Sequence, residues 1–395
     1  MRPLAARISV MTGEGALSVF ARAKELENEG RSIIHLELGE PDFHPATPVL
    51  DAAKQALEQG KDRYCPVQGV PALRQELAEY LNRTRHLNAS FDNVVIAPGC
   101  KIALFMAMMV LVEPGDEVLY PDPGFPGYSS ITLGLGGVPV PFGLAERNHF
   151  QPDPDEIAAK IMPGTKILIT NSPGNPTGTV YTDEVQRHIA KLAVQHDLLV
   201  LSDEIYARIM YGGEYVSMLR YPGMEERTLI IDGFSKSFAM TGWRLGYTVA
   251  PAHIVSALNM LTMNTYTCVA EFTQYAAIEA LRDRQGATER MVAEFAKRRE
   301  QFTHDLNRVP GFRCALPEGA FYAWVNVADT GMSAEEICRI MLEEAGVAAI
   351  PGAAFGPSGR DFVRFSFASS TATLKEAVER ILKVSAAWQG TPAGR

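Results

Sequence analysis

A lysine in a short polar loop is the residue of this sequence best placed to do chemistry. Lys236 follows the apolar run 228–231, within the segment D-G-F-S-K-S-F-A-M-T-G-W-R-L-G-Y (232–247). Arg244 comes eight residues later, just before the next apolar run, 245–250. Both runs are typical of buried strands. A lysine between two buried strands is poorly hydrated, which favours the neutral amine that forms a Schiff base with an aldehyde. A solvated lysine on a surface loop is the alternative.

Three further polar groups follow predicted strands. Gly99, Cys100 and Lys101 come after the strand 94–97, Asn175 lies in N-S-P-G-N-P-T-G after the strand 166–170, and Asp203 lies in S-D-E-I-Y after the strand 198–201. Free amides at the start of the helix predicted from Lys101 would attract an anion. Asp203 at a buried strand end needs a partner, either a cation or the amides of a helix that it caps. Open α/β sheets bind ligands beyond the carboxyl ends of their strands, so we expect these groups to meet Lys236 there.

An arginine in the C-terminal part of the chain could bind a carboxylate. Arg364 lies in D-F-V-R-F-S-F-A (361–368), an alternating pattern that predicts a strand. A guanidinium group matches a carboxylate with two parallel hydrogen bonds. A cross-strand ion pair is the alternative for Arg364.

The elements that must position these groups alternate between strands and helices. The sequence predicts helices over 13–30, 49–59, 101–112, 183–195, 289–307 and 335–345, and further strands over 32–38 and 117–120. The pattern is typical of an α/β fold. The composition changes after about residue 285, which indicates a second lobe.

Composition and charge argue against several classes of protein. The chain has 395 residues, of which 47% are hydrophobic, and a formal charge of −9, so we expect no nucleic-acid partner and no anionic membrane surface. Its longest apolar run, 102–112, is too short to cross a bilayer. Five scattered cysteines without a C-x-x-C pair predict neither disulfides nor a metal site. With no signal-peptide pattern at the N-terminus, we expect a cytoplasmic protein.

The motifs, in this order, resemble those of the class I aminotransferases, the fold-type-I enzymes that use pyridoxal 5'-phosphate. The resemblance rests on L-G-E-P-D-F (38–43), N-P-T-G (175–178), D-E-I-Y (203–206), S-K-S-F-A-M-T-G-W-R-L-G-Y (235–247) and R-F-S-F-A (364–368). It implies an α/β fold with a large cofactor-binding domain over 46–284, built on a mostly parallel seven-stranded sheet flanked by helices. A smaller α+β domain would combine residues 1–45 and 285–395.

The resemblance also implies a role for each candidate residue. Lys236 would hold the cofactor as a Schiff base and transfer the proton, while Asp203 would face the pyridinium nitrogen. Asn175 and Tyr206 would hydrogen-bond the phenolic oxygen, and Phe125 would stack on the ring, although a packing anchor is its alternative. Gly99, Cys100, Lys101, Ser235 and Arg244 would bind the phosphate, and Gly39, Asn175 and Arg364 would bind the substrate.

Tyr64 lies in R-Y-C-P (63–66). The resemblance implies that it reaches the cofactor phosphate of a neighbouring subunit, and so implies a homodimer. A tyrosine packed at a turn is the alternative. No metal is expected.

The implied reaction is transamination between a 2-amino acid and a 2-oxo acid, with several donors open. Lys101 favours an acidic substrate, whereas Phe125, Glu14 and Ala16 stand where aspartate-using relatives tend to have a tryptophan and hydroxyl residues. A general 2-amino-acid aminotransferase is therefore favoured, with a dicarboxylate such as glutamate or aspartate possible as one partner and a neutral amino acid possible as the donor. β-Elimination from cysteine-type substrates on the same fold is the alternative reaction. A non-catalytic regulator is disfavoured, because fewer than forty residues precede L-G-E-P-D-F and none of them forms a basic stretch.

Overall fold

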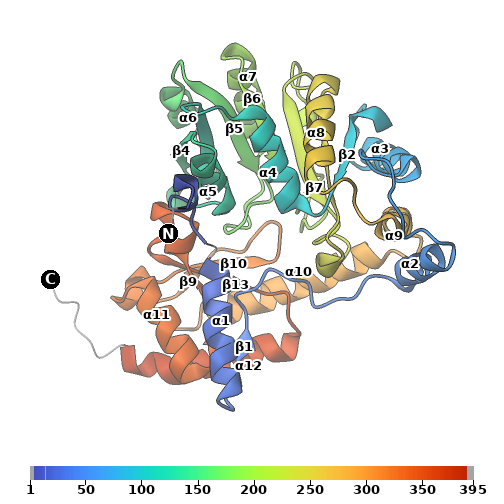
Figure 1. Cartoon of the computed structure of the whole chain (residues 1–395). Helices are drawn as coiled ribbons and strands as arrows, with labels where there is room; N and C mark the ends of the chain where they lie inside the picture. The colour runs from blue at the N-terminus through green and yellow to red at the C-terminus, as the bar shows by residue number, and fades with distance from the viewer. Residues whose placement is uncertain (1–3, 14, 389–395) are drawn as a thin grey trace.

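A seven-stranded sheet forms the centre of the larger part of the molecule (Figure 1). The computed structural model describes residues 4–13 and 15–388. The strands lie in the order β2-β8-β7-β6-β5-β3-β4, and β8 alone among them runs antiparallel to its neighbours. Their bounds are β2 (Val94–Ala97), β3 (Glu117–Asp122), β4 (Val138–Gly143), β5 (Thr165–Asn171), β6 (Leu199–Asp203), β7 (Thr228–Gly233) and β8 (Gly246–Val249).

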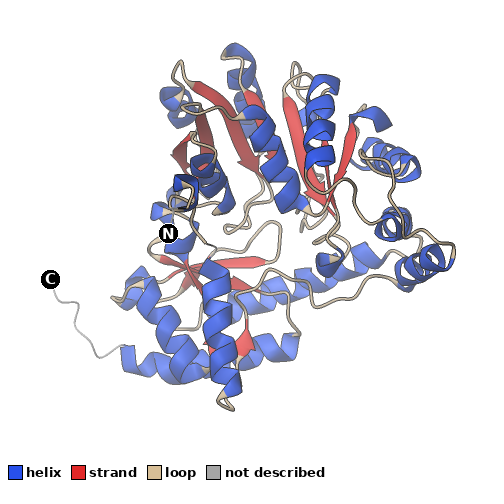
Figure 2. Cartoon of the chain, viewed as in Figure 1, coloured by secondary structure: helices blue, strands red, loops and turns tan. Residues whose placement is uncertain are grey.

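Helices cover both faces of this sheet, so its central strands are apolar on both sides (Figure 2). One face packs against α4 (Cys100–Leu111), α5 (Gly127–Gly134) and α8 (Ala252–Asn264). The other face packs against α3 (Pro71–Arg85), α6 (Pro154–Lys160), α7 (Asp183–Gln195) and α9 (Glu271–Arg282), with α2 (Thr47–Glu58) against α9. The fold is thus the α/β arrangement that the sequence predicts.

The two ends of the chain form the smaller part of the molecule together. A four-stranded antiparallel sheet has the order β12-β13-β10-β9, and a two-stranded parallel sheet joins β1 to β11. The strands are β1 (Ile34–His35), β9 (Arg313–Cys314), β10 (Tyr322–Asn326), β11 (Val347–Ala348), β12 (Ile350–Pro351) and β13 (Phe362–Ser366). The surrounding helices are α1 (Gly15–Asn28), α10 (Ala287–Leu306), α11 (Ala334–Ile340) and α12 (Thr371–Trp388).

Two predicted elements differ from the observed ones. The strand expected over 32–38 is limited to Ile34–His35. Beyond it, Leu36 divides its backbone hydrogen bonds between Ala348 and Ser366, and the carbonyl oxygen of Glu37 accepts a hydrogen bond from the Arg364 side chain. The helix expected over 335–345 ends at Ile340 and continues as a π-helical turn, Met341–Ala345. These departures reflect tertiary contacts that local sequence does not encode.

The parallel strands bring the predicted site residues to one edge of the large sheet. β2, β5, β6 and β7 end at this edge, and β8 begins there directly after Arg244 and Leu245. Within residues 4–13 and 15–388, no helix is long and apolar enough to span a membrane. No cluster of three or more histidine, cysteine or acidic residues suited to a metal ion occurs in the same ranges.

Candidate active site

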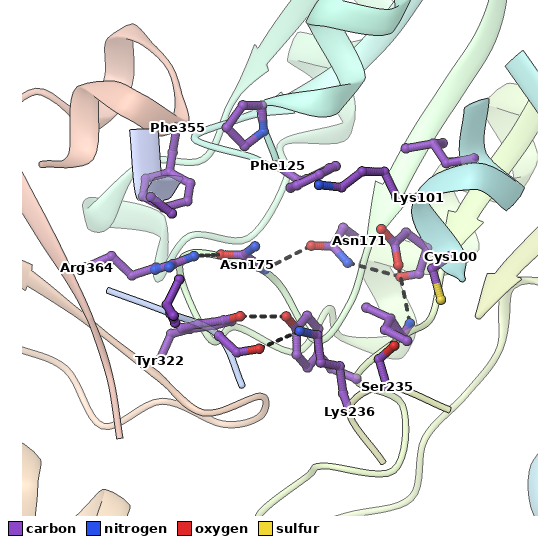
Figure 3. Close-up of a pocket in the computed structure, with 18 of the residues that line it drawn as sticks. Cys100, Lys101, Phe125, Asn171, Asn175, Ser235, Lys236, Tyr322, Phe355 and Arg364 are labelled. Carbon is purple, nitrogen blue, oxygen red and sulfur yellow. Dashed lines mark hydrogen bonds between the residues drawn. The ribbon is translucent and has the colours of Figure 1, made fainter. Parts of the chain in front are cut away.

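A cavity of about 300 Å³ lies between the large sheet and the smaller part of the molecule. Figure 3 shows side chains from both parts pointing into it. Nearly all residues predicted for the site line this cavity: Gly39, Cys100, Lys101, Phe125, Asn175, Asp203, Tyr206, Ser235, Lys236, Arg244 and Arg364. Gly99 borders it through its contact with Arg244, whereas Tyr64 lies elsewhere.

Lys236 follows β7 and extends into the cavity (Figure 3). Its amine donates a hydrogen bond to the carbonyl oxygen of Gly39. Gly39 packs directly on Tyr322, because a Cβ at Gly39 would lie 2.0 Å from the Tyr322 hydroxyl. The segment that carries Gly39 therefore reaches the lysine only because this residue lacks a side chain.

An anion site forms where α4 begins and Arg244 approaches it. Gly99 caps α4 with a φ of 94°, and a Cβ there would lie 2.5 Å from Nη2 of Arg244. The first amides of α4 have no partner within the helix, and the helix dipole adds positive potential. Burial raises the pKa of the Cys100 thiol well above its usual value, so Cys100 contributes its backbone amide rather than a thiolate. Ser235 lines the same cavity.

Asp203 ends β6 with its carboxylate held in place by two donors. The Tyr128 hydroxyl donates to Oδ2 at 2.7 Å, and the Ile205 amide donates to Oδ1 at 3.3 Å. Burial raises the pKa of Asp203 to about 6 despite these hydrogen bonds. A buried carboxylate of this kind is stabilised by a cation that enters the cavity. The helix-cap alternative for Asp203 does not hold, because the next helical element of the described residues is the 3-10 turn Met218–Arg220. Asp203 lines the cavity instead.

Two tyrosines and two asparagines line the middle of the cavity. The hydroxyl groups of Tyr206 and Tyr322 lie 2.7 Å apart and share a hydrogen bond. Asn171, the last residue of β5, accepts the backbone N–H of Asn175 at 2.9 Å and so fixes the N-P-T-G turn. Figure 3 shows both asparagines in a row that leads towards Arg364.

Arg364 lies at the opposite end of the cavity from the α4 amides, on β13. It donates to Asn175 Oδ1 at 2.9 Å and to the carbonyl oxygen of Glu37 at 2.6 Å. Its guanidinium carbon lies 4.4 Å from the ring centre of Tyr322 and 4.7 Å from that of Phe355. The residues opposite Arg364 in the sheet register are Trp324 and Ile350, and neither is acidic. This setting suits the binding of an external carboxylate.

Phe125 and Lys101 face each other on one wall, with Nζ of the lysine 5.8 Å from the ring centre. Ala16 and Leu17 line the same cavity, while Glu14 lies outside the described residues. Tyr64 is 87% exposed, so in the single chain it is not packed at a turn.

The residues around the cavity match the functional groups of pyridoxal 5'-phosphate. The α4 amides with Arg244 suit a phosphate, Asp203 suits a pyridinium nitrogen, and Lys236 suits an aldehyde. The glycine at position 99 leaves room that a Cβ would occupy. The donor set thus fits the cofactor.

Four important residues were missing from the sequence prediction. They are the partners of predicted residues: Tyr128 holds Asp203, Asn171 holds Asn175, and Tyr322 and Phe355 enclose Arg364. Asn171 begins the N-S-P-G-N-P-T-G string, so it stood inside the segment that predicted Asn175. Tyr128, Tyr322 and Phe355 were not singled out, because their role depends on packing between distant segments.

Comparisons with known proteins agree with this geometry. The family model "Aminotransferase class I and II" matches residues 31–381. The aspartate aminotransferase of Geobacillus stearothermophilus is 38% identical over 96% of this chain and 98% of that protein. The aromatic-amino-acid aminotransferase 2 of Thermococcus litoralis is 37% identical over 96% and 98%.

A comparison with solved structures gives the same result. The aspartate aminotransferase from Thermus thermophilus with maleate superposes with a TM-score of 0.93 at 36% identity, covering 97% of this chain and 100% of that one. The motifs, the cavity and the match over most of the chain lead to one conclusion. The chain belongs to the class I and II aminotransferases and is a pyridoxal 5'-phosphate-dependent transaminase of fold type I.

Proposed function

We propose that this transaminase takes 2-amino acids with neutral, apolar side chains as donors, with a dicarboxylic 2-oxo acid as one possible acceptor. The observation that carries the proposal is the lining of the cavity beyond the cofactor residues. Ala16, Leu17, Leu104, Ala354 and Phe355 present apolar groups there. An apolar lining favours an apolar substrate side chain, because a carboxylate placed against these five residues would lose hydration without gaining a polar contact from them.

The proposed roles of the chain's own residues follow from their positions. Bound pyridoxal phosphate supplies an aldehyde that condenses with amines and a ring that withdraws electrons from the substrate α-carbon. Arg364 binds the substrate α-carboxylate and so orients the amino acid. The Lys236 amine removes and returns the α-proton, and Asp203 keeps the ring nitrogen protonated. The anion site of Gly99, Cys100, Lys101, Ser235 and Arg244 anchors the phosphate.

Steady-state kinetics with matched donors tests the substrate proposal. We expect kcat/KM for leucine or phenylalanine to exceed that for aspartate by about tenfold or more, as in pockets that select by apolar contact. Lys101→Ala should lower kcat/KM for an acidic substrate more than for a neutral one, because the lysine is the cation on that wall. A preference for aspartate over every neutral donor would refute the proposal.

β-Elimination on the same constellation is the alternative reaction. It would release pyruvate and ammonia from a cysteine-type substrate, whereas transamination releases a 2-oxo acid without free ammonia. An ammonia assay with a β-leaving-group donor therefore separates the two. We expect ammonia release to stay well below oxo-acid formation.

We also propose that the enzyme works as a cytoplasmic homodimer with its active sites completed across the interface. The exposed Tyr64 supports this, since its ring contributes little to packing within one chain. The division into a large domain over 46–284 and a small domain from 1–45 and 285–395 belongs to the same proposal. It is supported by the separate sheets, since the seven-stranded sheet lies within 94–249 and the smaller sheets are built from the two ends of the chain.

A further inference from the structure

A buried ion cluster lies behind Asp203 and does not line the cavity. Arg85, the last residue of α3, contacts Glu204 with Nη1 and Oε2 2.5 Å apart, and it also pairs with Asp232. The side chains of all three are at most 4% exposed. None of the three belongs to the candidate site described above.

The two carboxylates sit on the strand ends that carry the site. Glu204 directly follows Asp203 at the end of β6, and Asp232 lies in β7, four residues before Lys236. By holding both carboxylates, the Arg85 guanidinium clamps the functional ends of β6 and β7 to each other. The clamp thus acts on the two strands that present the site's acid and its amine.

Neutral donors hold the remaining oxygens of the cluster. Ser202 and Ser217 donate to Glu204 Oε1 at 3.0 and 2.6 Å. Asp232 accepts the Gly233 amide at 2.6 Å and the Tyr247 hydroxyl at 2.7 Å. Such a network fixes both carboxylates in position. Buried ion clusters contribute little net stability because desolvation offsets their attraction, so a purely structural role explains this one poorly.

The cluster is not neutral. One guanidinium group faces two carboxylates directly behind Asp203. Burial raises the pKa of Glu204, whereas Arg85 and the hydrogen bonds from Ser217 and Ser202 favour its ionised form, in which the cluster carries one net negative charge. Glu204 and Asp232 both act to raise the pKa of Asp203, after the larger effect of burial. The other groups around Asp203 are the Tyr128 hydroxyl from α5, the Tyr206 hydroxyl from its own segment and the Cys100 thiol from α4. Burial keeps these three protonated. Lys236 and Arg244 are the cations that line the same cavity as Asp203, and the cluster is the anionic neighbour on the opposite side of Asp203 from the cavity.

We propose that Arg85, Glu204 and Asp232 are positioning residues that set how tightly Asp203 holds a cation in the cavity. The fixed negative charge favours a protonated ring nitrogen, and Arg85 limits that charge to one unit. This inference rests on the proposed role of Asp203 and deepens it. It assigns to residues outside the cavity a share in keeping the cofactor ring cationic.

The test compares the binding of two cofactors to the full chain as a function of pH. Pyridoxal phosphate carries the ring nitrogen, whereas 1-deazapyridoxal phosphate lacks it but keeps the phosphate and the aldehyde. The ratio of their dissociation constants therefore reports the ionisation of Asp203, and contributions from the phosphate and Lys236 cancel. For the unmodified protein we expect the ratio to change with a midpoint near pH 6, as the pKa of Asp203 of about 6 requires.

An electrostatic role predicts that the pH midpoint of this ratio moves in opposite directions when a negative or a positive charge of the cluster is removed, whereas a structural role does not. Asp232→Asn removes one negative charge and should lower the midpoint by about half a unit to one unit. Glu204→Gln should also lower the midpoint. Arg85→Gln should raise the midpoint, and Arg85→Lys, which keeps the charge, should leave it near that of the unmodified protein. If Arg85→Gln does not fold, Asp232→Asn and Glu204→Gln alone test the electrostatic role.

Asp197→Asn is the matched control, because it also neutralises an arginine-paired carboxylate, but one whose side chain is 94% exposed. An unchanged midpoint in Asp232→Asn and Glu204→Gln, or a rise in both, would overturn the proposal. If no variant and not even the unmodified protein binds pyridoxal phosphate, the proposed function itself fails, which is a separate outcome.

Discussion

The proposed chemistry of this site depends on a single amine. Lys236 is the lysine at the end of β7, its amine is held by the Gly39 carbonyl, and it faces the same cavity as Asp203 and Arg364. We predict that Lys236→Ala lowers kcat by at least about 10³-fold, within the range for loss of a positioned acid–base group, and leaves the circular dichroism spectrum unchanged. Lys191→Ala, at an exposed position of α7, serves as the control. Retained transamination in Lys236→Ala would contradict the assignment.

The buried carboxyl group of Asp203 should lower the free energy of unfolding of the cofactor-free protein at neutral pH. Its pKa is raised in the folded protein from 3.8 to about 6, so the folded state holds a proton to higher pH than the unfolded state does. Between about pH 4 and pH 6 the folded state therefore binds more protons, and stability falls as pH rises through this window. A shift of roughly two units corresponds to about 3 kcal/mol.

Asp203→Asn should remove this penalty, since an amide does not ionise and still accepts from Tyr128. We expect the cofactor-free variant to be more stable at pH 8 by up to about 3 kcal/mol, with little gain at pH 4. Urea unfolding at the two pH values measures the difference. The same variant should bind pyridoxal phosphate more weakly. Equal stability of the two proteins at pH 8 would show that the carboxyl group carries no such penalty.

Arg364 is the residue on which substrate binding should depend. Its guanidinium group donates hydrogen bonds to Asn175 and to the carbonyl oxygen of Glu37. The same group contacts the rings of Tyr322 and Phe355, so a lysine cannot reproduce its geometry. Arg364→Lys should raise KM for the best donor by about tenfold or more and change the dissociation constant of pyridoxal phosphate by less than about twofold. Separate measurement of KM and cofactor affinity checks this. An unchanged KM would place the carboxylate elsewhere.

At the scale of elements, the start of α4 gives the sharpest test. A Cβ at Gly99 would press on the Arg244 guanidinium, and the φ of 94° is strained for any other residue. Gly115 has nearly the same φ, 93°, but nothing lies within 4 Å of its Cβ position. Gly99→Ala and Gly115→Ala should lose similar stability, about 1 kcal/mol each. Only Gly99→Ala should weaken pyridoxal phosphate binding, by about tenfold. Equal cofactor affinity in both variants would argue against a phosphate site there.

The elements themselves were predictable where local signals agree. The helix expected over 183–195 matches α7 at both ends, because Thr182 caps it and the apolar residues follow one face. The strand ends that carry Asn175, Asp203 and Lys236 were also predicted, since continuous apolar runs mark buried parallel strands. The shortened β1 was not predicted, because Leu36 and Glu37, which follow it, bond to Ser366 and Arg364 near the other end of the chain.

The site was predictable through its motifs but not through its supports. Residues that would touch the cofactor lie in short strings with recognisable order. Tyr128, Phe355 and the Arg85 cluster act through packing and buried charge between distant segments. A single sequence holds no local mark of such pairs, and only the folded chain brings them together.

At the scale of the whole molecule, the proposed homodimer makes Tyr64 part of its partner's site. Tyr64→Phe should weaken cofactor binding in the homodimer by several-fold, because it removes one hydrogen-bond donor. Mixing Tyr64→Phe subunits with Lys236→Ala subunits should restore tight binding in the hybrids. There, the site with an intact Lys236 receives Tyr64 from the other subunit. Purified hybrids that bind no better than the Tyr64→Phe homodimer would contradict the exchange across the interface.

The most direct test of the central claim is the visible absorption spectrum of the purified protein, before and after single amino acids are added without an oxo acid. We predict a yellow protein whose visible absorption band bleaches when neutral donors transfer their amino group. One molecule of 2-oxo acid should form for each active site. A colourless protein that takes up no pyridoxal phosphate would contradict the account. A band that persists while ammonia and pyruvate accumulate would instead establish the lyase reaction.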